Sequence, residues 1–187
     1  MDSFFKKVSV TSAMLDNLLL WANSQISGLT ANLSKLDLPA VIDRQLDLMK
    51  LLAMEKKISI SNQTPALSFE VLADEGHIRV IIQNLVGNAI KFTPEGGHIS
   101  IEYKKDAHGM QVSVRDTGVG MSEAKLKQLF NSLGQGISTY GTKNEKGIGI
   151  GLVLVKRYLA ENDATLLVES EVGKGTCFTM VFKASRI

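Results

Sequence analysis

The run Asn84–Pro94 (NLVGNAIKFTP) constrains this chain more than any other stretch. Because the residue before a proline disfavours helical backbone, a helix that passes through the run must stop near Thr93. At about 100° per residue, Asn84, Asn88 and Lys91 fall in one narrow polar stripe of that helix. The apolar residues of a neighbouring face are expected to enter the core: Ile78, Ile81, Ile82, Leu85 and Ala89.

Two amide side chains and one ammonium group in a row can serve a metal-bound polyphosphate. Mg²⁺ prefers oxygen ligands and leaves much of its shell to water and phosphate, and a lysine offsets phosphate charge as a point charge. The alternative is a solvated helix face with no ligand. Gly87 favours a ligand or a close neighbour, because glycine in mid-helix costs about 1 kcal/mol against alanine.

Length and composition bound the function classes. The chain has 187 residues, which suits one domain with an additional element. The net charge is +2 and the sequence has no block of basic residues, so no nucleic-acid partner is expected. A single cysteine, Cys177, excludes an internal disulfide and suits a reducing compartment. Since neither a membrane-length apolar run nor a signal peptide is visible, we expect a cytoplasmic segment without membrane contact, whether or not a longer parent protein is anchored.

The first 36 residues are expected to form one long helix. Apolar residues recur there at alternating spacings of four and three, which is a heptad pattern, and further apolar side chains such as Trp21 widen that face. A partner helix in a bundle explains so wide a face, and packing on its own domain is the alternative. The pattern positions are Leu15, Leu19, Ala22, Ile26, Leu29 and Leu33.

Asp37 and Pro39 mark the start of the next helix, so we divide the chain into residues 1–36 and 37–187. Asp74 is expected to cap the helix that carries the polar stripe. Alternation of apolar residues predicts two short strands before that helix, Ile58–Ser61 and Leu67–Val71, and after it a hairpin of His98–Lys105 and Met110–Asp116. The long polar stretch 131–147 is a loop, which in a compact domain is usually functional or disordered. A helix over Ile150–Ala160 and two strands close the chain.

Two glycine-containing stretches follow these elements. Asp116–Met121 (DTGVGM) comes directly after a predicted strand. A carboxylate there can accept a hydrogen bond from an adenine amino group while the glycines bend around the ring. Gly147–Leu152 (GIGIGL) opens a predicted helix, whose N-terminus favours phosphate. It matches neither the dinucleotide fingerprint nor the P-loop, and each stretch alone is also typical of an ordinary turn.

Taken together, four stretches resemble the N, G1, G2 and G3 boxes of the GHKL ATP-binding superfamily: Asn84–Pro94, Asp116–Met121, Gly147–Leu152 and Gly173–Thr176. The resemblance covers roughly residues 37–185 and is closest to the catalytic (HATPase_c) domain of bacterial sensor histidine kinases. It implies an α/β two-layer sandwich of the Bergerat type with a mixed five-stranded sheet. ATP would lie between the polar-stripe helix and a lid formed by residues 131–147.

The resemblance also implies a role for each motif residue. Asn84, Asn88 and Lys91 are the implied catalytic residues, with Asn88 as the Mg²⁺ ligand and Lys91 on phosphate. Phe92 would flank the adenine, and Asp116 would receive its amino group. The remaining implied ATP-binding residues are Gly118 and Gly120 beside the adenine, Lys143 toward the γ-phosphate, Gly147, Gly149, Gly151 and Leu152 along the phosphates, and Thr176 near the base.

Asn84 separates kinases from hydrolases in this superfamily. Its ATP hydrolases, such as gyrase-type topoisomerases and mismatch-repair ATPases, carry a glutamate general base at the matching position. An amide cannot accept a proton there, so water activation lacks its base and kinase activity is favoured.

The histidines depart from the histidine-kinase pattern. Kinases of this type carry a phosphoacceptor histidine followed by an acidic residue on the first helix of a dimerisation hairpin. The three histidines here, His77, His98 and His108, lack that context. Residues 1–36 resemble the second helix of the hairpin, so we expect the fragment to begin after the acceptor helix.

These observations predict the ATP- and Mg²⁺-binding catalytic domain of a two-component sensor histidine kinase. The expected partners are a second copy of the chain through the N-terminal helix, the acceptor-histidine helix of the parent protein, and a response-regulator receiver domain. Two rival functions stay open: a GHKL anti-sigma-factor-type serine kinase, and a nucleotide-sensing interaction module without phosphotransfer.

The N-terminal segment generates a prediction about association. Each buried Leu or Ile contributes about 1.5–3 kcal/mol to the free energy of association. Burial of the heptad positions between two copies of the helix, Leu19 and Ile26 among them, is therefore expected to hold a dimer at micromolar concentration. Sedimentation velocity should show that dimer, and Leu19→Glu combined with Ile26→Glu should dissociate it while ATP affinity stays unchanged. A monomer at high concentration would contradict the prediction.

Overall fold

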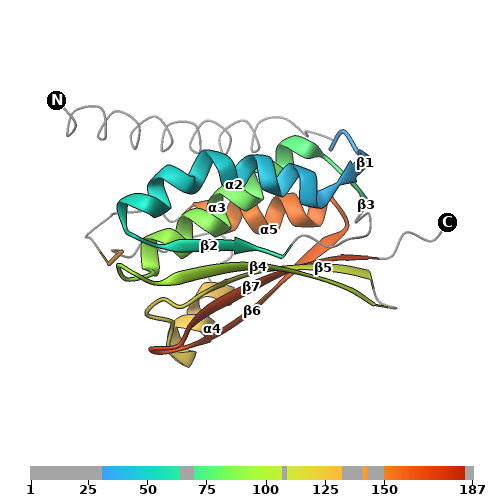
Figure 1. Cartoon of the computed structure of the whole chain (residues 1–187). Coiled ribbons are helices and arrows are strands. Elements are labelled where there is room, and N and C mark those ends of the chain that lie inside the picture. The colour runs from blue at the N-terminus through green and yellow to red at the C-terminus, as the bar shows by residue number, and fades with distance from the viewer. Residues whose placement is uncertain (1–30, 64–69, 107–108, 132–140, 143–149, 184–187) are drawn as a thin grey trace.

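Figure 1 shows a computed structural model of the chain, which describes residues 31–63, 70–106, 109–131, 141–142 and 150–183. The helices in these ranges are α2 (Leu38–Glu55), α3 (Glu75–Phe92), α4 (Glu123–Asn131) and α5 (Gly151–Glu161). The strands are β1 (Ser34–Asp37), β2 (Ser59–Asn62), β3 (Glu70–Ala73), β4 (His98–Asp106), β5 (Gly109–Asp116), β6 (Ala164–Glu171) and β7 (Gly175–Lys183).

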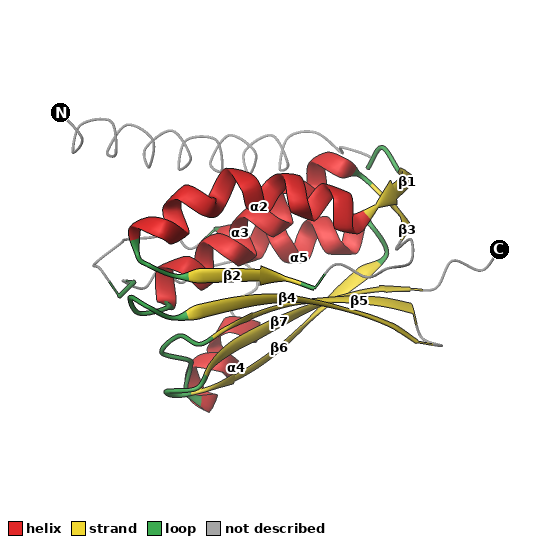
Figure 2. Ribbon diagram, in the orientation of Figure 1, coloured by secondary structure: helices red, strands yellow, loops and turns green. Residues whose placement is uncertain are grey.

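One five-stranded sheet forms the base of the molecule, with strand order β2-β4-β5-β7-β6. β2 runs parallel to β4, and the other neighbours are antiparallel. Helices α2, α3 and α5 form a second layer over one face of this sheet (Figure 2). The predicted α/β two-layer sandwich with a mixed five-stranded sheet is therefore confirmed.

The core lies between these two layers. The apolar face predicted for the polar-stripe helix is buried in full, and α3 packs against both α2 and α5. The sheet contributes alternate residues of its central strands, as expected for strands with one covered face. The fully buried large side chains include Leu38, Ile42, Ile78, Ile81, Ile82, Leu85, Ile99, Ile101, Leu154, Leu159 and Met180.

Helix α3 begins and ends where its sequence signals predict. The Asp74 side chain accepts a hydrogen bond of 3.0 Å from the backbone N–H of His77, which is an N-cap. Thr93, the residue before Pro94, has extended backbone (φ −86°, ψ 129°) and ends the helix. The polar stripe thus lies on the last three turns of a helix fixed at both ends.

The helix predicted for residues 1–36 is wrong at its C-terminal end. Ser34–Asp37 is strand β1, antiparallel to β3 in a separate two-stranded sheet that the sequence analysis missed. Leu36 is buried opposite Val71, whereas Leu33 is 42% exposed. The heptad spacing selected Leu33, but strand pairing with a segment far along the chain decides which leucine enters the core.

Two smaller expectations are resolved. Asp37 stands at the N-cap position of α2, yet its side chain makes no capping hydrogen bond, while Pro39 lies in the first turn as predicted.

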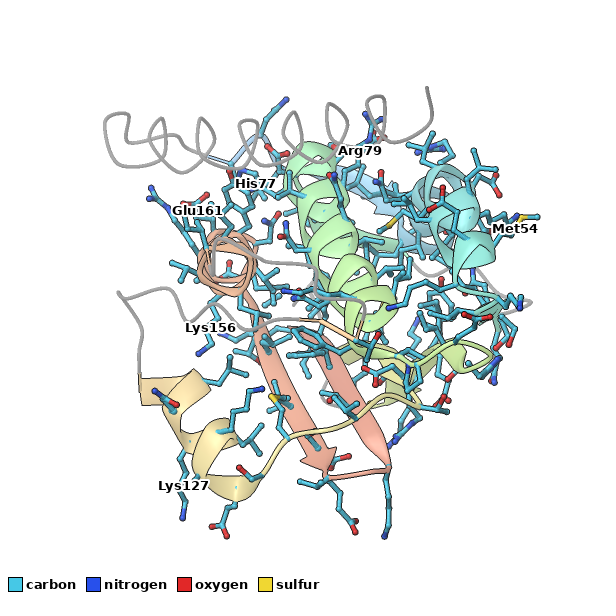
Figure 3. The ribbon with its side chains drawn as sticks, turned by 90° about the vertical axis from the view of Figure 1, so that its left-hand side faces the viewer. Met54, His77, Arg79, Lys127, Lys156 and Glu161 are labelled. Atoms are coloured by element: carbon cyan, nitrogen blue, oxygen red, sulfur yellow. The ribbon has the colours of Figure 1, made fainter. Side chains whose placement is uncertain are left out.

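Within the described part of the chain, α4 is held beneath α5 by Lys156, whose Nζ donates to the Leu129 carbonyl at 3.4 Å (Figure 3). No helix in the described ranges is long and apolar enough to cross a membrane.

Gly87 faces α2, and its environment generates a stability prediction. A Cβ added there would lie 3.7 Å from the Met49 methyl group, an ordinary van der Waals contact. Gly87→Ala should therefore raise the free energy of unfolding by about 0.5–1 kcal/mol, since alanine loses less backbone entropy in a helix. Denaturant unfolding followed by circular dichroism measures this change.

Gly120→Ala is the matched control, because Gly120 has φ +63° and an added Cβ would overlap the Glu171 carbonyl. That variant should be destabilised by the same measurement. Loss of stability in Gly87→Ala would show that α2 and α3 pack more tightly than the structure has them.

Candidate functional site

The polar stripe of α3 contributes the first wall of the site. Asn84, Asn88 and Lys91 are all half-buried, whereas the apolar face of the same helix is fully covered. The Asn84 side chain is oriented by its own helix, since its Nδ2 donates to the Val80 carbonyl at 2.8 Å. That bond fixes the amide so that Oδ1 is the atom offered on the other side.

Asn84 Oδ1 meets the start of α5. A Cβ added to Gly151 would overlap this oxygen, so any other residue there would displace the Asn84 amide. The structure therefore brings two of the predicted motifs into contact and supplies a physical reason for the glycine. Leu152, the next predicted residue, is half-buried and packs against the core from the first turn of α5.

Asp116 contributes the second wall, at the end of β5. The residue is 5% exposed, and its Oδ1 accepts backbone N–H bonds from Gly118 at 2.8 Å and Thr176 at 3.1 Å. Burial raises the pKa of the Asp116 carboxyl, and the two N–H bonds only partly offset that rise. Since both bonds end on Oδ1, Oδ2 is the acceptor atom available to a ligand amino group.

The turn after Asp116 is wedged against α3. A Cβ on Gly118 would lie 2.6 Å from the Phe92 carbonyl oxygen, and the backbone N–H of Val119 donates to that same oxygen at 3.1 Å. Gly120, with positive φ, lies against the backbone of Glu171 in the β6–β7 turn. The predicted shaping role of Gly118 and Gly120 thus has a steric basis, because neither position has room for a side chain.

Gly175 is a site residue that the sequence analysis did not single out by itself. It has φ +107°, and a Cβ there would overlap the Asp116 carbonyl oxygen. The next residue, Thr176, is buried and donates its N–H to Asp116, so the structure brings these two predicted site residues together. A Gly-Thr pair at the start of a strand was the available signal, but pairing with β5 decides its role.

Phe92 lies between two cations. The Lys91 Nζ is 4.8 Å from the centre of its ring, and the Lys125 Nζ from α4 is 5.9 Å away. Both distances allow cation–π attraction. Lys125 belongs to none of the predicted motifs, and only the fold brings it here, so the positive charge beside Phe92 is greater than the sequence suggested.

Three predicted residues, Lys143, Gly147 and Gly149, lie outside the described residues. Of the predicted lid 131–147, the described residue Thr142 donates its backbone N–H to the Lys91 carbonyl at 3.1 Å. This described residue of the segment is therefore bound to the C-terminal end of α3.

The polar side chains of the site determine which kind of metal ion it could hold. In the described ranges, no group of three or more His, Cys, Asp or Glu side chains could hold an ion. The stripe instead offers neutral amide oxygens, and the Asn84 oxygen faces the start of α5 because Nδ2 is bonded to its own helix. That chemistry fits a Mg²⁺ ion whose charge is balanced by phosphate oxygens rather than by protein carboxylates.

The site combines a buried carboxylate at a strand end with an amide and ammonium stripe on a helix. The profile of the family described as histidine kinase-, DNA gyrase B-, and HSP90-like ATPases matches residues 73–186. The chain belongs to this family.

Among individual relatives, sporulation kinase C of Bacillus subtilis is 41% identical over 108 residues, which cover 58% of this chain and 24% of the relative. The phosphate regulon sensor protein PhoR of Pseudomonas aeruginosa is 34% identical over 122 residues, which cover 65% of this chain and 27% of the relative. The chain thus spans about a quarter of the length of these two relatives.

Solved structures show the same fold. Full-length ShkA in complex with AMPPNP matches with a TM-score of 0.73 and 28% identity over 92% of this chain and 36% of ShkA. The histidine kinase ThkA in complex with the response regulator TrrA has a TM-score of 0.72 at 19% identity, over 96% of this chain and 49% of ThkA. The histidine-kinase type of catalytic domain, predicted from the four motifs, is confirmed.

Substitution of the buried Asp116 carboxylate is predicted to weaken ATP binding without lowering the stability of the fold. Asp116→Asn keeps an oxygen for the Gly118 and Thr176 N–H groups but replaces the free acceptor with an amide that can present NH₂. ATP binding should weaken by about 1–3 kcal/mol, the cost of an unpaired buried polar group. Calorimetry measures the affinity, and thermal unfolding at neutral pH should show that the variant is at least as stable as the wild type.

The pH dependence of that comparison follows from the raised pKa. A folded-state pKa above the unfolded value means that the native state holds a proton which the unfolded chain has lost, so stability falls as pH rises through this window. The variant has no such carboxyl. Its stability advantage should therefore grow from the ordinary aspartate range up to the raised pKa, and a loss of stability with unchanged ATP affinity would contradict the assignment.

Proposed function

We propose that the chain is the ATP- and Mg²⁺-binding part of a sensor histidine kinase, and that it transfers the γ-phosphoryl group of ATP to a histidine outside these 187 residues. The buried Asp116 carboxylate, held by two backbone N–H groups beside the amide stripe of α3, carries the proposal. The division into an N-terminal helical part and an ATP-binding domain, and dimerisation through the former, belong to the same proposal.

The residues of the chain would act mainly by binding and orienting. Asp116 accepts the adenine amino group, with Thr176 and the Gly118–Gly120 turn closing the pocket around the base. Lys91 offsets phosphate charge, and Phe92 flanks the base. Gly151 brings the start of α5 close to Asn84, where its backbone would line the phosphates, and Gly147, Gly149 and Lys143 precede it in the sequence. Such a site works by positioning and charge neutralisation.

Asn88 would hold Mg²⁺ through its amide oxygen, with Asn84 beside it. When bound, the metal supplies positive charge that offsets the phosphates. In the transfer itself, the bond from the γ-phosphorus to the bridging oxygen of ADP breaks, and a phosphorus–nitrogen bond to the acceptor imidazole forms. Asn84 cannot take a proton from water, because its Nδ2 donates to Val80 and its oxygen is a neutral amide oxygen. Slow hydrolysis beside transfer is expected.

The described histidines have structural roles that support an external acceptor. His77 stacks on Tyr158 with ring centres 4.1 Å apart and its Nδ1 contacts Asn162 Nδ2 at 3.2 Å, close to Glu161 (Figure 3). His98 contacts Ser59 Oγ at 2.8 Å and Ser61 Oγ at 3.0 Å through its two ring nitrogens. His108 lies outside the described residues.

The relatives support the remaining parts of the proposal. They include a sporulation kinase and a phosphate regulon sensor protein, and one solved relative is a histidine kinase in complex with a response regulator. We therefore propose a response-regulator receiver domain as the partner that consumes the phosphoryl group, and a cytoplasmic setting for this part of the protein.

The test uses a separately made acceptor-helix domain mixed with the chain and γ-labelled ATP. Acid-labile label should appear on the added domain and not on His77, His98 or His108. Asn88→Ala should reduce transfer by at least about tenfold at a limiting Mg²⁺ concentration, because one oxygen ligand is lost. Glu123→Ala, on the exposed face of α4, is the matched control and should transfer normally.

Two outcomes would overturn the proposal. ATP binding without any transfer would identify a nucleotide-sensing module. Acid-labile label mapped to a histidine of the chain itself would show that the acceptor is not external.

A further inference from the structure

A buried lysine that belongs to none of the motifs lies beneath the site. Lys56 follows α2 as its C-cap residue and is only 5% exposed. Its Nζ donates to the carbonyl oxygens of Ile90 at 2.7 Å and Lys91 at 3.1 Å. The same Nζ lies 2.7 Å from the hydroxyl of Thr142, to which it also donates. One ammonium group therefore joins three separate segments.

The C-terminal end of α3 explains why a charged side chain is stable there. The last carbonyls of a helix lack intrahelical partners, and the helix dipole makes this end negative. A buried ammonium is costly unless hydrogen bonds satisfy it, and here two helix carbonyls and a hydroxyl do so. An apolar residue at position 56 would leave these acceptors without their buried donor.

Thr142 is bound to α3 by its own groups as well. Its N–H donates to the Lys91 carbonyl at 3.1 Å, and its hydroxyl lies 3.1 Å from that oxygen and 3.2 Å from the Thr93 carbonyl. In the sequence, Thr142 directly precedes Lys143, and eight further residues lead to Gly151 at the start of α5. Thr142 is therefore bound to the end of α3 through both its backbone and its side chain.

We infer that Lys56 is a positioning residue of the nucleotide site. Its ammonium binds the Thr142 hydroxyl and the carbonyls of Ile90 and Lys91, and so fixes the end of α3 from which the Lys91 side chain extends. Asp116 receives its donors from Gly118 and Thr176 instead. Lys56 therefore acts on the phosphate half of the site and not on the adenine half. The consequence for nucleotides depends on the proposed function, whereas the contact itself does not.

The experiment compares matched variants of the 187-residue chain. Lys56→Met removes the ammonium and keeps the length of the side chain, and Thr142→Val removes the hydroxyl at constant shape. Lys57→Met is the control, since the neighbouring Lys57 side chain is 77% exposed and pairs with Glu95. Amide hydrogen exchange of Thr142 reports the contact without nucleotide, and calorimetry with Mg-ATP and with adenosine reports its effect on each half of the site.

Lys56→Met should speed Thr142 amide exchange and weaken Mg-ATP binding, each by about tenfold or more, with adenosine affinity within about threefold of the wild type. Thr142→Val should weaken Mg-ATP binding by about threefold or more, yet add less than about twofold in the Lys56→Met background. Lys57→Met should leave all three measurements unchanged.

Equal losses for Mg-ATP and adenosine, additive effects of the two substitutions, or unchanged Thr142 exchange would overturn the inference. If Lys56→Met does not fold, Thr142→Val alone decides: unchanged Mg-ATP affinity contradicts the inference. If the wild type binds no nucleotide, the proposed function fails, and faster Thr142 exchange in Lys56→Met still tests the contact.

Discussion

The carbonyl groups at the C-terminal end of α3 hold the site together. Because Pro94 forces the helix to stop, these oxygens have no partners within the helix. Segments from three distant parts of the sequence supply donors instead: Lys56 after α2, Val119 after β5 and Thr142 before α5. The helix that carries the amide stripe therefore also fixes the loops that face it, and a single proline-terminated helix end determines much of the site geometry.

The opposite wall depends on one buried carboxylate. Asp116 ties the end of β5 to its own turn through Gly118 and to β7 through Thr176. Glycines at positions 118 and 175 bring the backbone close enough for these bonds, and burial raises the pKa of the carboxyl. Such an acceptor costs stability in the absence of a ligand, which is a common property of residues that bind or react. The two walls belong to different layers of the sandwich, so the site lies where helix end and strand end meet.

The motifs made much of this predictable. Helical periodicity placed Asn84 and Asn88 on one face, and the strand before Asp116 placed that carboxylate at a strand end. What the sequence did not predict depends on contacts between remote segments: the pairing of β1 with β3, which turned Leu36 inward, and the burial of Lys56, which sits in an ordinary polar turn. Gly87 had suggested a ligand or a close neighbour, but the atom that an added Cβ would meet there is the methyl group of the flexible Met49 side chain. Local pattern thus selected the candidate site residues, and contacts between distant segments decide how their side chains are held.

The central claim is that Asp116 recognises the amino group of adenine. The most direct measurement is the ratio of affinities for ATP and inosine triphosphate, which carries a carbonyl oxygen where ATP carries that amino group. A buried acceptor facing an oxygen leaves both groups unpaired, so the wild-type chain should bind inosine triphosphate at least about tenfold more weakly. Equal affinities for the two nucleotides would contradict the account.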